Sequence, residues 1–356
     1  MLSANFADEN QCAPVSGIVV KELDLPQSAV TNGCALCHSI LTSKKFTVNE
    51  TMFLTGQTFD YTQCGNCESL NREKSNVDLS ALYPDNYYSL SPDPVEIFSK
   101  FIPRYLARMM ARSALRGKIL FLVLIQNLAP KREVRTLASI MISISRTKKE
   151  SSWGRILDVG TGSGVVPFVL GLSHSESVLG IDPFATPKGD VTATHAEQTD
   201  IHSISGEFDL IMFNHSLEHV DDIESTLITA TKRLAFDGRI IIRIPTVSSY
   251  AWRTYAESWY QIDAPRHSSI PSRRGLQLLA ERCGLSIIYT YDDSTETQFW
   301  ISEHVKQGLS TMDSASGLLR SASQSHFKLF RFKLQAKKLN LLRDGDQTAI
   351  ILKRIL

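Results

Sequence analysis

The stretch Ile156-Leu157-Asp158-Val159-Gly160-Thr161-Gly162-Ser163-Gly164 decides the fold of this chain. A short run typical of a β-strand, with one aspartate in it, leads into three glycines at alternate positions. This pattern predicts a strand that ends in a tight turn, where glycine lets a ligand approach the backbone and adopts positive φ. A glycine-rich loop alone is weak evidence, because many α/β proteins contain one.

A second predicted strand, Ser177-Val178-Leu179-Gly180-Ile181-Asp182, ends in a carboxylate at the distance that a Rossmann-like site requires. In such sites an acidic residue about 20 residues past the loop binds the ribose hydroxyls. A dinucleotide site favours G-x-G-x-x-G facing a pyrophosphate. Here the spacing is G-x-G-x-G, and Asp158 would repel phosphate but suit a cationic ligand. The two strands therefore predict a nucleoside cofactor with a cationic portion.

The motif D-x-G-x-G-x-G resembles motif I of the class I S-adenosylmethionine (SAM)-dependent methyltransferases. Further segments follow in the order of that family. Phe208-Asp209-Leu210-Ile211-Met212-Phe213-Asn214 resembles its fourth strand, and Leu217-Glu218-His219-Val220 resembles the segment after it. The stretch from Leu234 to Pro245 resembles a helix end, a turn and the fifth strand. The resemblance covers about residues 153–305.

This resemblance implies an α/β fold with a Rossmann-like, doubly wound methyltransferase sheet and SAM as the cofactor. It places the methionine portion against Asp158 and the three glycines, and the ribose against Asp182. It places Asn214 beside the sulfonium. The cofactor-binding residues expected from it are Asp158, Gly160, Gly162, Gly164, Asp182 and Asn214.

The bulk composition excludes several classes of protein. The chain has 356 residues, more than a typical single domain, and a formal net charge of +1, which does not indicate a nucleic-acid binder. Residues 1–10 have neither the basic nor the apolar region of a signal peptide. The longest apolar run, Ile119–Ile125, is too short to span a bilayer and predicts a buried helix. We therefore expect a cytoplasmic, soluble enzyme.

Four cysteines form two C-x-x-C pairs separated by 26 residues. In an intracellular chain this pairing favours a metal over disulfides, and four thiolates suit a closed tetrahedral Zn²⁺ site. The expected ligands are Cys34, Cys37, Cys64 and Cys67. His38 is an alternative ligand beside the first pair. A redox role for the two pairs is the other alternative, but the thioredoxin-like βαβ context is missing. We expect no role for Cys12 or Cys283.

These features predict the organisation of the chain. A ribbon as small as the cysteine module would need the binding energy of the metal to fold. The predicted parts are a lead-in (1–30), a zinc-binding Cys₄ module (31–75), a junction and basic helical region (76–150), a SAM-dependent methyltransferase domain (151–305) with an aromatic substrate insertion (246–272), and a helical C-terminal tail (306–356).

The helical region carries a basic stripe at every fourth position: Lys100, Arg104, Arg108, Arg112 and Arg116. One interpretation is a solvated helix face over the core. The other is a peripheral membrane contact through the 94–118 helix, or a surface for a phosphate-bearing substrate.

A hydroxyl or carbon acceptor must lose a proton during methyl transfer, so the site needs a general base. The candidates are His267, His215, Glu218 and His219. The pair Glu218-His219 has a purely structural alternative. The segment around His267, with Asp263 and Arg266, is too polar for a core, so we expect it in the acceptor site. In the same insertion Trp252 and Trp259 are candidates either for stacking on a sugar ring or for core packing.

Three features make the resemblance within this family more specific. They are the cysteine module, the junction Tyr83-Pro84-Asp85-Asn86-Tyr87-Tyr88 and the motif Asp263-Ala264-Pro265-Arg266-His267. Together they are similar to bacterial deoxysugar C-methyltransferases and to methyltransferases associated with surface polysaccharides. The implied acceptor is a nucleotide-linked or lipid-linked sugar, and C- versus O-methylation stays open.

Three alternatives remain. A zinc-ribbon RNA methyltransferase would need a basic substrate face, against which the near-zero net charge argues. The Asn-His-Ser that ends the fourth strand also departs from the motif of exocyclic-amine methyltransferases. A non-catalytic SAM- or zinc-binding scaffold conflicts with the intact cofactor motif. An NAD-dependent oxidoreductase conflicts with the glycine spacing and with Asp158.

Overall fold

The computed structural model describes residues 33–40, 44–74, 93–129, 131–147, 153–173, 177–185, 196–312 and 325–355. The predicted lead-in, Cys12 and the tyrosine-rich junction at 83–88 lie outside these ranges.

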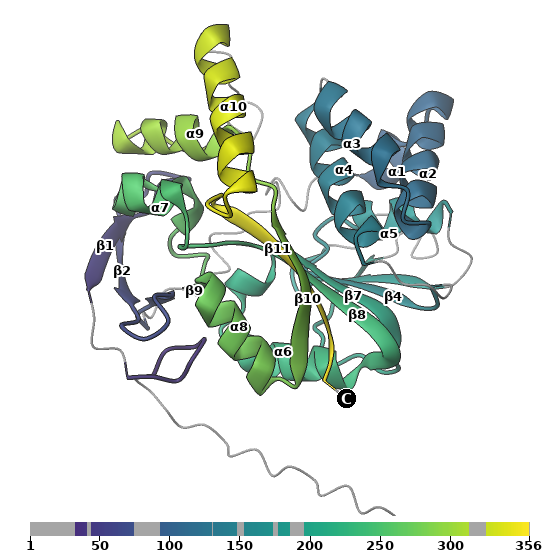
Figure 1. Ribbon diagram of the computed structural model, residues 1–356, viewed down its shortest axis with the longest axis horizontal. Coiled ribbons are helices and arrows are strands. Elements are labelled where there is room, and N and C mark those ends of the chain that lie inside the picture. The colour runs from purple at the N-terminus through teal and green to yellow at the C-terminus, as the bar shows by residue number, and fades with distance from the viewer. Residues whose placement is uncertain are drawn as a thin grey trace, which may run out of the picture. The chain divides into compact units, whose positions relative to one another are not determined.

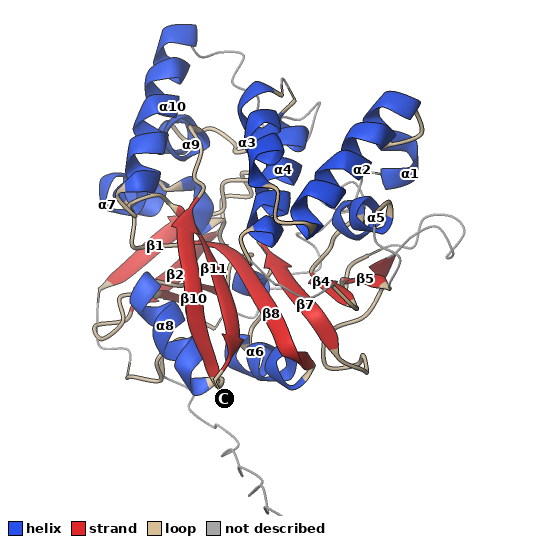
Figure 2. Cartoon of the chain, turned by 45° about the vertical axis from the view of Figure 1, so that its right-hand side comes forward, coloured by secondary structure: helices blue, strands red, loops and turns tan. Residues whose placement is uncertain are grey.

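A seven-stranded sheet carries the glycine loop (Figures 1 and 2). Its order is β10-β11-β8-β7-β4-β5-β6. The neighbours from β8 to β6 run parallel, whereas β11 runs antiparallel to both β8 and β10. The strands are β4 Ile156–Val159, β5 Val178–Ile181, β6 Ala196–Glu197, β7 Phe208–Asn214, β8 Leu234–Pro245, β10 Leu285–Asp292 and β11 Gln347–Arg354. This is the predicted Rossmann-like α/β fold.

Helices cover both faces of this sheet, which gives three layers (Figure 2). Neighbouring residues of a strand point to opposite faces, so Ile240 and Ile242 join one core and Ile241 joins the other. The first core includes α6 Ile223–Lys232 and α8 Arg273–Arg282; the second includes α5 Val165–Gly171. Because both faces are covered, the strands read as apolar runs without alternation.

The predicted helical region is confirmed over the described residues. Its helices lie on the same side of the sheet as α5, and α2 and α4 supply buried residues to that core (Figure 2). The helices are α1 Pro94–Ile97, α2 Phe101–Leu115, α3 Ile119–Leu128 and α4 Arg132–Ser145. Among the described helices, each is too short or too polar to span a bilayer.

The prediction of a helical C-terminal tail was right for one helix and wrong for the residues after it. Helix α10 (His326–Leu341) is present, but β11 follows it and lies between β8 and β10. The apolar run Ala349-Ile350-Ile351-Leu352 is buried there, because a strand inside a sheet is covered on both faces. The tail therefore completes the sheet. Helix α9 (Thr297–Lys306) crosses the predicted domain boundary at 305.

The turn expected before the fifth strand forms part of β8. The register of β8 with β7 shifts between Phe208, which pairs with Leu234, and Leu210, which pairs with Arg239. The residues between these two pairs bulge out of the ladder. Asp237-Gly238, a pair typical of turns, therefore marks an irregularity within one strand.

A second sheet joins the cysteine module to the predicted aromatic insertion. Its order is β1-β2-β3-β9, and all its described pairs are antiparallel. The first three strands belong to the module, whereas β9 comes from the insertion about 200 residues later. The strands are β1 Lys45–Asn49, β2 Thr58–Gln63, β3 Leu70–Arg72 and β9 Ser269–Ile270. The remaining helical segments of the insertion are α7 Tyr250–Tyr255, η3 Ala256–Ser258 and η4 Tyr260–Ile262.

Candidate functional site: the carboxyl edge of the sheet

The glycine loop follows β4 at the point where the strand order reverses, which is where open α/β sheets bind ligands. Gly160, Gly162 and Gly164 all have positive φ, of 72°, 59° and 78°. Gly160 has a second constraint, because a Cβ there would lie 2.3 Å from the Cβ of Ser216. The loop can therefore take its path only with glycine at these positions.

Asp182 lies at the end of β5, next to this loop. The Gly162 N–H donates to its Oδ2 and the Phe184 N–H donates to its Oδ1, each at 2.9 Å. Two backbone donors thus fix the carboxylate at the edge of the sheet, where the resemblance expects the ribose.

Asp158 is buried at the root of the loop. Its carboxylate accepts hydrogen bonds from Thr161 Oγ1 at 2.8 Å and from Asn214 Nδ2 at 3.1 Å. Burial raises the pKa of Asp158 to about 6; the two hydrogen bonds oppose this rise and the nearby Asp182 adds to it. Because a bound cation would favour the ionised carboxylate, the site suits the cationic portion of SAM. Asn214 Oδ1 is buried without a hydrogen-bond partner among the described residues, so it can accept from a ligand.

The four candidate bases gather beside Asn214. His215 follows β7 directly with a φ of 53°, and the 3-10 turn η2 (Leu217–His219) carries Glu218 and His219. His215 Nδ1 lies 3.4 Å from Glu218 Oε1, and His267 Nε2 lies 3.9 Å from the same oxygen. The rings of His219 and His267 meet edge to face with centroids 4.6 Å apart. The structure therefore brings all four together.

Glu218 is the most buried member of this cluster, with no exposed surface. Neither carboxylate oxygen has a hydrogen bond of ordinary geometry within the described part of the chain. Burial alone would raise its pKa, but His215 and the other two histidines outweigh burial and hold the pKa of Glu218 below its usual value. The carboxylate is therefore an anion that stabilises positive charge on the imidazoles around it.

The two imidazoles at the centre of the cluster have the same tautomer. His267 Nδ1 lies 2.9 Å from the Gln261 carbonyl oxygen, and His219 Nδ1 lies 3.2 Å from that of Arg266. A carbonyl only accepts, so Nδ1 donates in each neutral ring and Nε2 keeps the lone pair. Burial is the main cause that lowers the pKa of His267 to about 4, and the nearby His219 adds to the shift. Glu218 and Asp263 oppose it. His267 is thus neutral at pH 7.

The expectation that the segment around His267 is too polar for a core was wrong about its burial. Arg266 and His267 are both buried. The Arg266 guanidinium lies 2.5 Å from Asp263 Oδ1 and 3.6 Å from Glu50 Oε1, so two carboxylates compensate its charge. Charged side chains enter a protein interior when they are paired in this way.

The cysteine module holds this segment in place. The Tyr61 hydroxyl donates to the His267 carbonyl oxygen at 2.8 Å, and Arg72 donates to that of Pro265. Next to His267, Ser269 pairs with Asn71 across β9 and β3. Glu50, Tyr61 and Arg72 could not be predicted as neighbours of this segment, because nothing in their local sequence connects them to residues about 200 positions away.

The four predicted zinc ligands converge. All four Sγ atoms lie within 4.8 Å of one another, and the shortest described distances, 3.5 Å each, join Cys34 to Cys67 and Cys37 to Cys64. These contacts run between the two C-x-x-C pairs and are too long for disulfides. A tetrahedral Zn²⁺ with bonds of about 2.3 Å separates its sulfurs by about 3.8 Å, so the four residues fit this ion.

The structure also places His38, Cys283 and the two tryptophans of the insertion. His38 Nε2 lies 2.5 Å from Glu224 Oε2, so its partner is a carboxylate of α6. Trp252 and Trp259 are buried, and the Trp252 ring meets that of Phe46 in β1 with centroids 4.9 Å apart. Both tryptophans therefore pack the core between the module and the insertion. Cys283 is buried at the end of α8, near Glu224.

Comparison with known proteins identifies the domain that carries this site. Residues 124–290 match a family model described as a methyltransferase domain. This span runs from α3 into β10 and includes the glycine loop, Asp182 and the histidine cluster. A comparison with curated proteins gave no match.

Solved structures that resemble the chain include the cyclopropane synthase MmaA2 from Mycobacterium tuberculosis, at 13% identity over 63% of this chain and 86% of that one, with a TM-score of 0.41. A SAM-dependent methyltransferase from Archaeoglobus fulgidus is 16% identical over 66% of this chain and 99% of that one, with a TM-score of 0.40. Likeness at this level says nothing about substrate. From the family match and the loop geometry, the chain contains a class I SAM-dependent methyltransferase domain and is a SAM-dependent methyltransferase.

Proposed function

We propose that this protein methylates a sugar carried on a nucleotide or a lipid, as a step in glycan or surface-polysaccharide biosynthesis. The observation that carries the proposal is the position of the histidine cluster. It lies next to Asn214, and the segment that supplies His267 is held by the cysteine module. The cysteine module and the His267 motif, which both resemble parts of the sugar methyltransferases, contact each other in this fold, and this contact supports the proposal.

Bound SAM supplies an electrophilic methyl group. The protein must place the acceptor atom in line with it and remove the acceptor's proton, and alignment alone lowers such barriers by several kcal/mol. Asn214 and the glycine loop sit on the cofactor side. His267 Nε2, with its free lone pair, faces the cluster and takes the proton from the acceptor hydroxyl or C–H group.

Glu218 would stabilise the charge that this proton creates. Its Oε1 lies 3.9 Å from His267 Nε2, and its burial strengthens the attraction to an imidazolium. His215 and His219 are the alternative proton acceptors in the same cluster. The three histidines and Glu218 therefore act as one unit on the acceptor side.

We propose that the four cysteines bind one Zn²⁺ with a structural role. Four thiolates leave no open coordination position, so the ion would take no part in methyl transfer. Two of its ligands, Cys64 and Cys67, lie between β2 and β3, the strands whose Tyr61 and Arg72 hold the His267 segment. Zinc would thereby position the acceptor side of the site.

The test is a methyl-transfer assay with a panel of nucleotide-linked sugars, lipid-linked sugars and short RNAs, read by mass spectrometry. We expect a mass gain of one methyl group on a sugar. In the His267→Asn variant turnover should fall by about 10²–10⁴-fold, while calorimetry gives an unchanged affinity for S-adenosylhomocysteine. His202→Ala, which changes an exposed histidine that precedes β7 and contacts Thr229 of α6, is the matched control.

Methylation of RNA and of no sugar would overturn the sugar assignment. Normal turnover by His267→Asn would move the proton acceptor to another member of the cluster. Elemental analysis should give one zinc per chain. A second bound metal that is lost in His219→Ala would show that Glu218, His219 and His267 form a metal site instead of a base.

A further inference from the structure

Two helices, α3 and α10, each have two apolar faces, of which only one is packed. Most surface helices bury one apolar stripe and present a polar face to solvent. An exposed apolar stripe on the opposite side is therefore a feature that needs a partner.

On α10, the packed face consists of Phe332, Ala336 and Leu339, which contact Phe299 of α9. At 100° per residue, a second set of apolar side chains falls within a sector of about 60° on the opposite side of the helix. Every member of this set is more than half exposed, and Leu341 reaches 86%. The set consists of Phe327, Phe330, Leu334 and Leu341.

Helix α3 has the same construction. Leu122 is fully buried, whereas Leu120, Leu124 and Leu128 form a stripe at every fourth position on the other side. All three leucines are more than half exposed, and Leu120 reaches 84%. The helix has only ten residues, about half of what a bilayer span requires. Its outer face can therefore lie on a membrane but cannot cross it.

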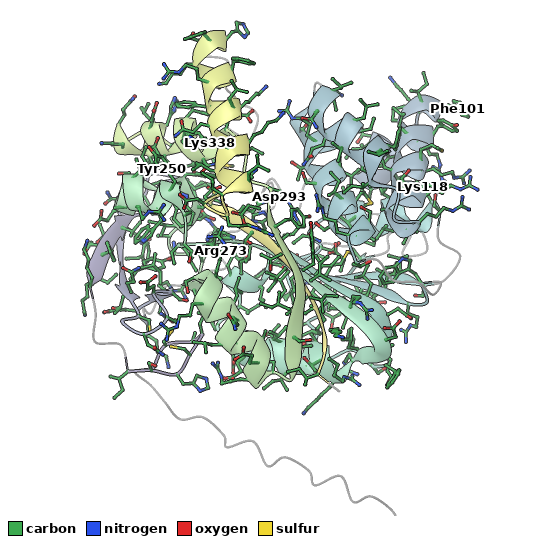
Figure 3. All side chains as sticks on the ribbon, viewed as in Figure 1. Phe101, Lys118, Tyr250, Arg273, Asp293 and Lys338 are labelled. Carbon is green, nitrogen blue, oxygen red and sulfur yellow. The ribbon has the colours of Figure 1, made fainter. Side chains whose placement is uncertain are left out.

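The two helices are neighbours. Lys337 Nζ of α10 donates to Asn127 Oδ1 of α3 at 3.1 Å, and both helices rise on the same side of the central sheet (Figures 1 and 2). Helix α2 stands on that side as well, and Phe101 is its first residue. Figure 3 labels Phe101 on α2 and Lys338 on α10. The helices that carry the exposed stripes thus stand together on one side of the central sheet.

The charges of this side favour an anionic partner. Helix α10 carries five Lys or Arg residues and no Asp or Glu. The exposed Lys338 flanks one side of its exposed stripe, and Lys337, which donates to Asn127, lies on the other side. The exposed residues Arg116, Lys118 and Lys131 flank the two ends of α3. Long basic side chains beside an apolar stripe cover it with their stems and reach lipid phosphates with their charged ends.

We propose that α3 and α10 dock the protein on the surface of an anionic phospholipid bilayer. Exposed leucines and phenylalanines would enter the boundary between headgroups and acyl chains, and the Lys and Arg side chains nearby would be attracted to an anionic leaflet. A second copy of the chain is a poorer partner, because two faces of the same positive charge repel each other.

The membrane contact would then lie on α3 and α10, and not on the basic stripe of residues 94–118. Two of the stripe's arginines are engaged within the protein: Arg104 lies over the ring of Phe168, and Arg108 Nε donates to the Leu172 carbonyl oxygen at 2.9 Å. Helix α2 would then contribute mainly through its exposed Phe101 and Ile102. The inference goes beyond the proposed function and does not depend on the identity of the acceptor.

The test is flotation of the full chain with vesicles of phosphatidylcholine, with and without phosphatidylglycerol. We expect binding only to the anionic vesicles. The double variants Leu124→Glu/Leu128→Glu and Phe330→Glu/Leu334→Glu should each lower binding by about tenfold or more, because each removes two large apolar side chains from the interface. Phe236→Glu, at an exposed phenylalanine in β8, is the matched control and should bind normally.

Equal binding to neutral vesicles, or no binding to either kind, would overturn the proposal. Light scattering without vesicles gives a second check: a dimer that the same variants dissociate would identify the face as an interface between copies. Calorimetry with S-adenosylhomocysteine shows whether the variants still fold. Retained cofactor binding with lost vesicle binding would support the docking surface whatever the acceptor proves to be.

Discussion

The proposed cofactor side and the proposed acceptor side of this site are built in different ways. On the cofactor side, each group directly follows a strand: the glycine loop follows β4, Asp182 follows β5 and Asn214 ends β7. On the acceptor side, His267 is held by Tyr61 and Arg72 of a separate sheet, about 200 residues earlier in the chain. One side is set by local backbone geometry, the other by contacts between distant segments.

Because of this difference, a substitution on one side should impair that side and leave the other intact. Parallel strands place their carboxyl ends along one edge whatever surrounds the sheet, so the cofactor side needs only the sheet. The acceptor side needs the second sheet and the buried pairs of Arg266 with Asp263 and Glu50. Damage to the module should therefore disable the acceptor side and spare cofactor binding.

The largest expected effect removes the cofactor side alone. Asp182→Ala deletes the carboxylate that we expect to bind two ribose hydroxyls, and hydrogen bonds to charged groups contribute about 1.5–3 kcal/mol each. Calorimetry should show a loss of about 10²–10⁴-fold in affinity for S-adenosylhomocysteine. Circular dichroism should show an unchanged fold. An unchanged affinity would remove Asp182 from the site and the ribose from this edge.

The next effect is an acid sensitivity of the acceptor side. The folded pKa of His267 is about 4, below its unfolded value of about 6.5, so the unfolded chain binds more protons between these values. Stability should therefore fall by up to about 3 kcal/mol as pH drops from about 6.5 to about 4. Urea midpoints across this range would measure the slope, and His267→Asn should flatten it. An equal slope in the variant would assign the sensitivity to other groups.

The same contrast explains which parts of the fold and of the candidate site can be predicted from the sequence. Strands β4, β5 and β7, the glycine loop and the convergence of the four cysteines follow from short patterns, and the structure has each of them as expected. The burial of Arg266 and His267 could not be predicted, because it depends on Glu50 and Tyr61, which carry no local signal. The run 349–352 did have a strand signal, but the basic residues of the tail obscured it.

A smaller effect should come from the cysteine module, to which we assign a zinc ion in our proposal. In a Cys34→Ser/Cys64→Ser variant we expect loss of the metal and a fall in turnover of about 10–100-fold, as β3 no longer fixes β9 and the His267 segment. Affinity for S-adenosylhomocysteine should stay within about threefold of the original. Elemental analysis and calorimetry provide the two readings. If cofactor binding falls together with turnover, the two sides are not independent.

The smallest effect concerns the charge of Asp158. Because burial holds its pKa at about 6, an incoming cation meets a carboxylate that is mostly ionised at pH 7 and mostly protonated at pH 5. The affinity for S-adenosylhomocysteine, whose ammonium group is cationic, should therefore fall by about tenfold across that range. Asp158→Asn should bind more weakly at pH 7 and lose this dependence, since its amide does not titrate. Asp209→Asn, at another aspartate of the same sheet, is the control and should keep the dependence. If the wild-type affinity does not change with pH, Asp158 supports the loop from within and the cationic portion of the cofactor lies elsewhere on the edge.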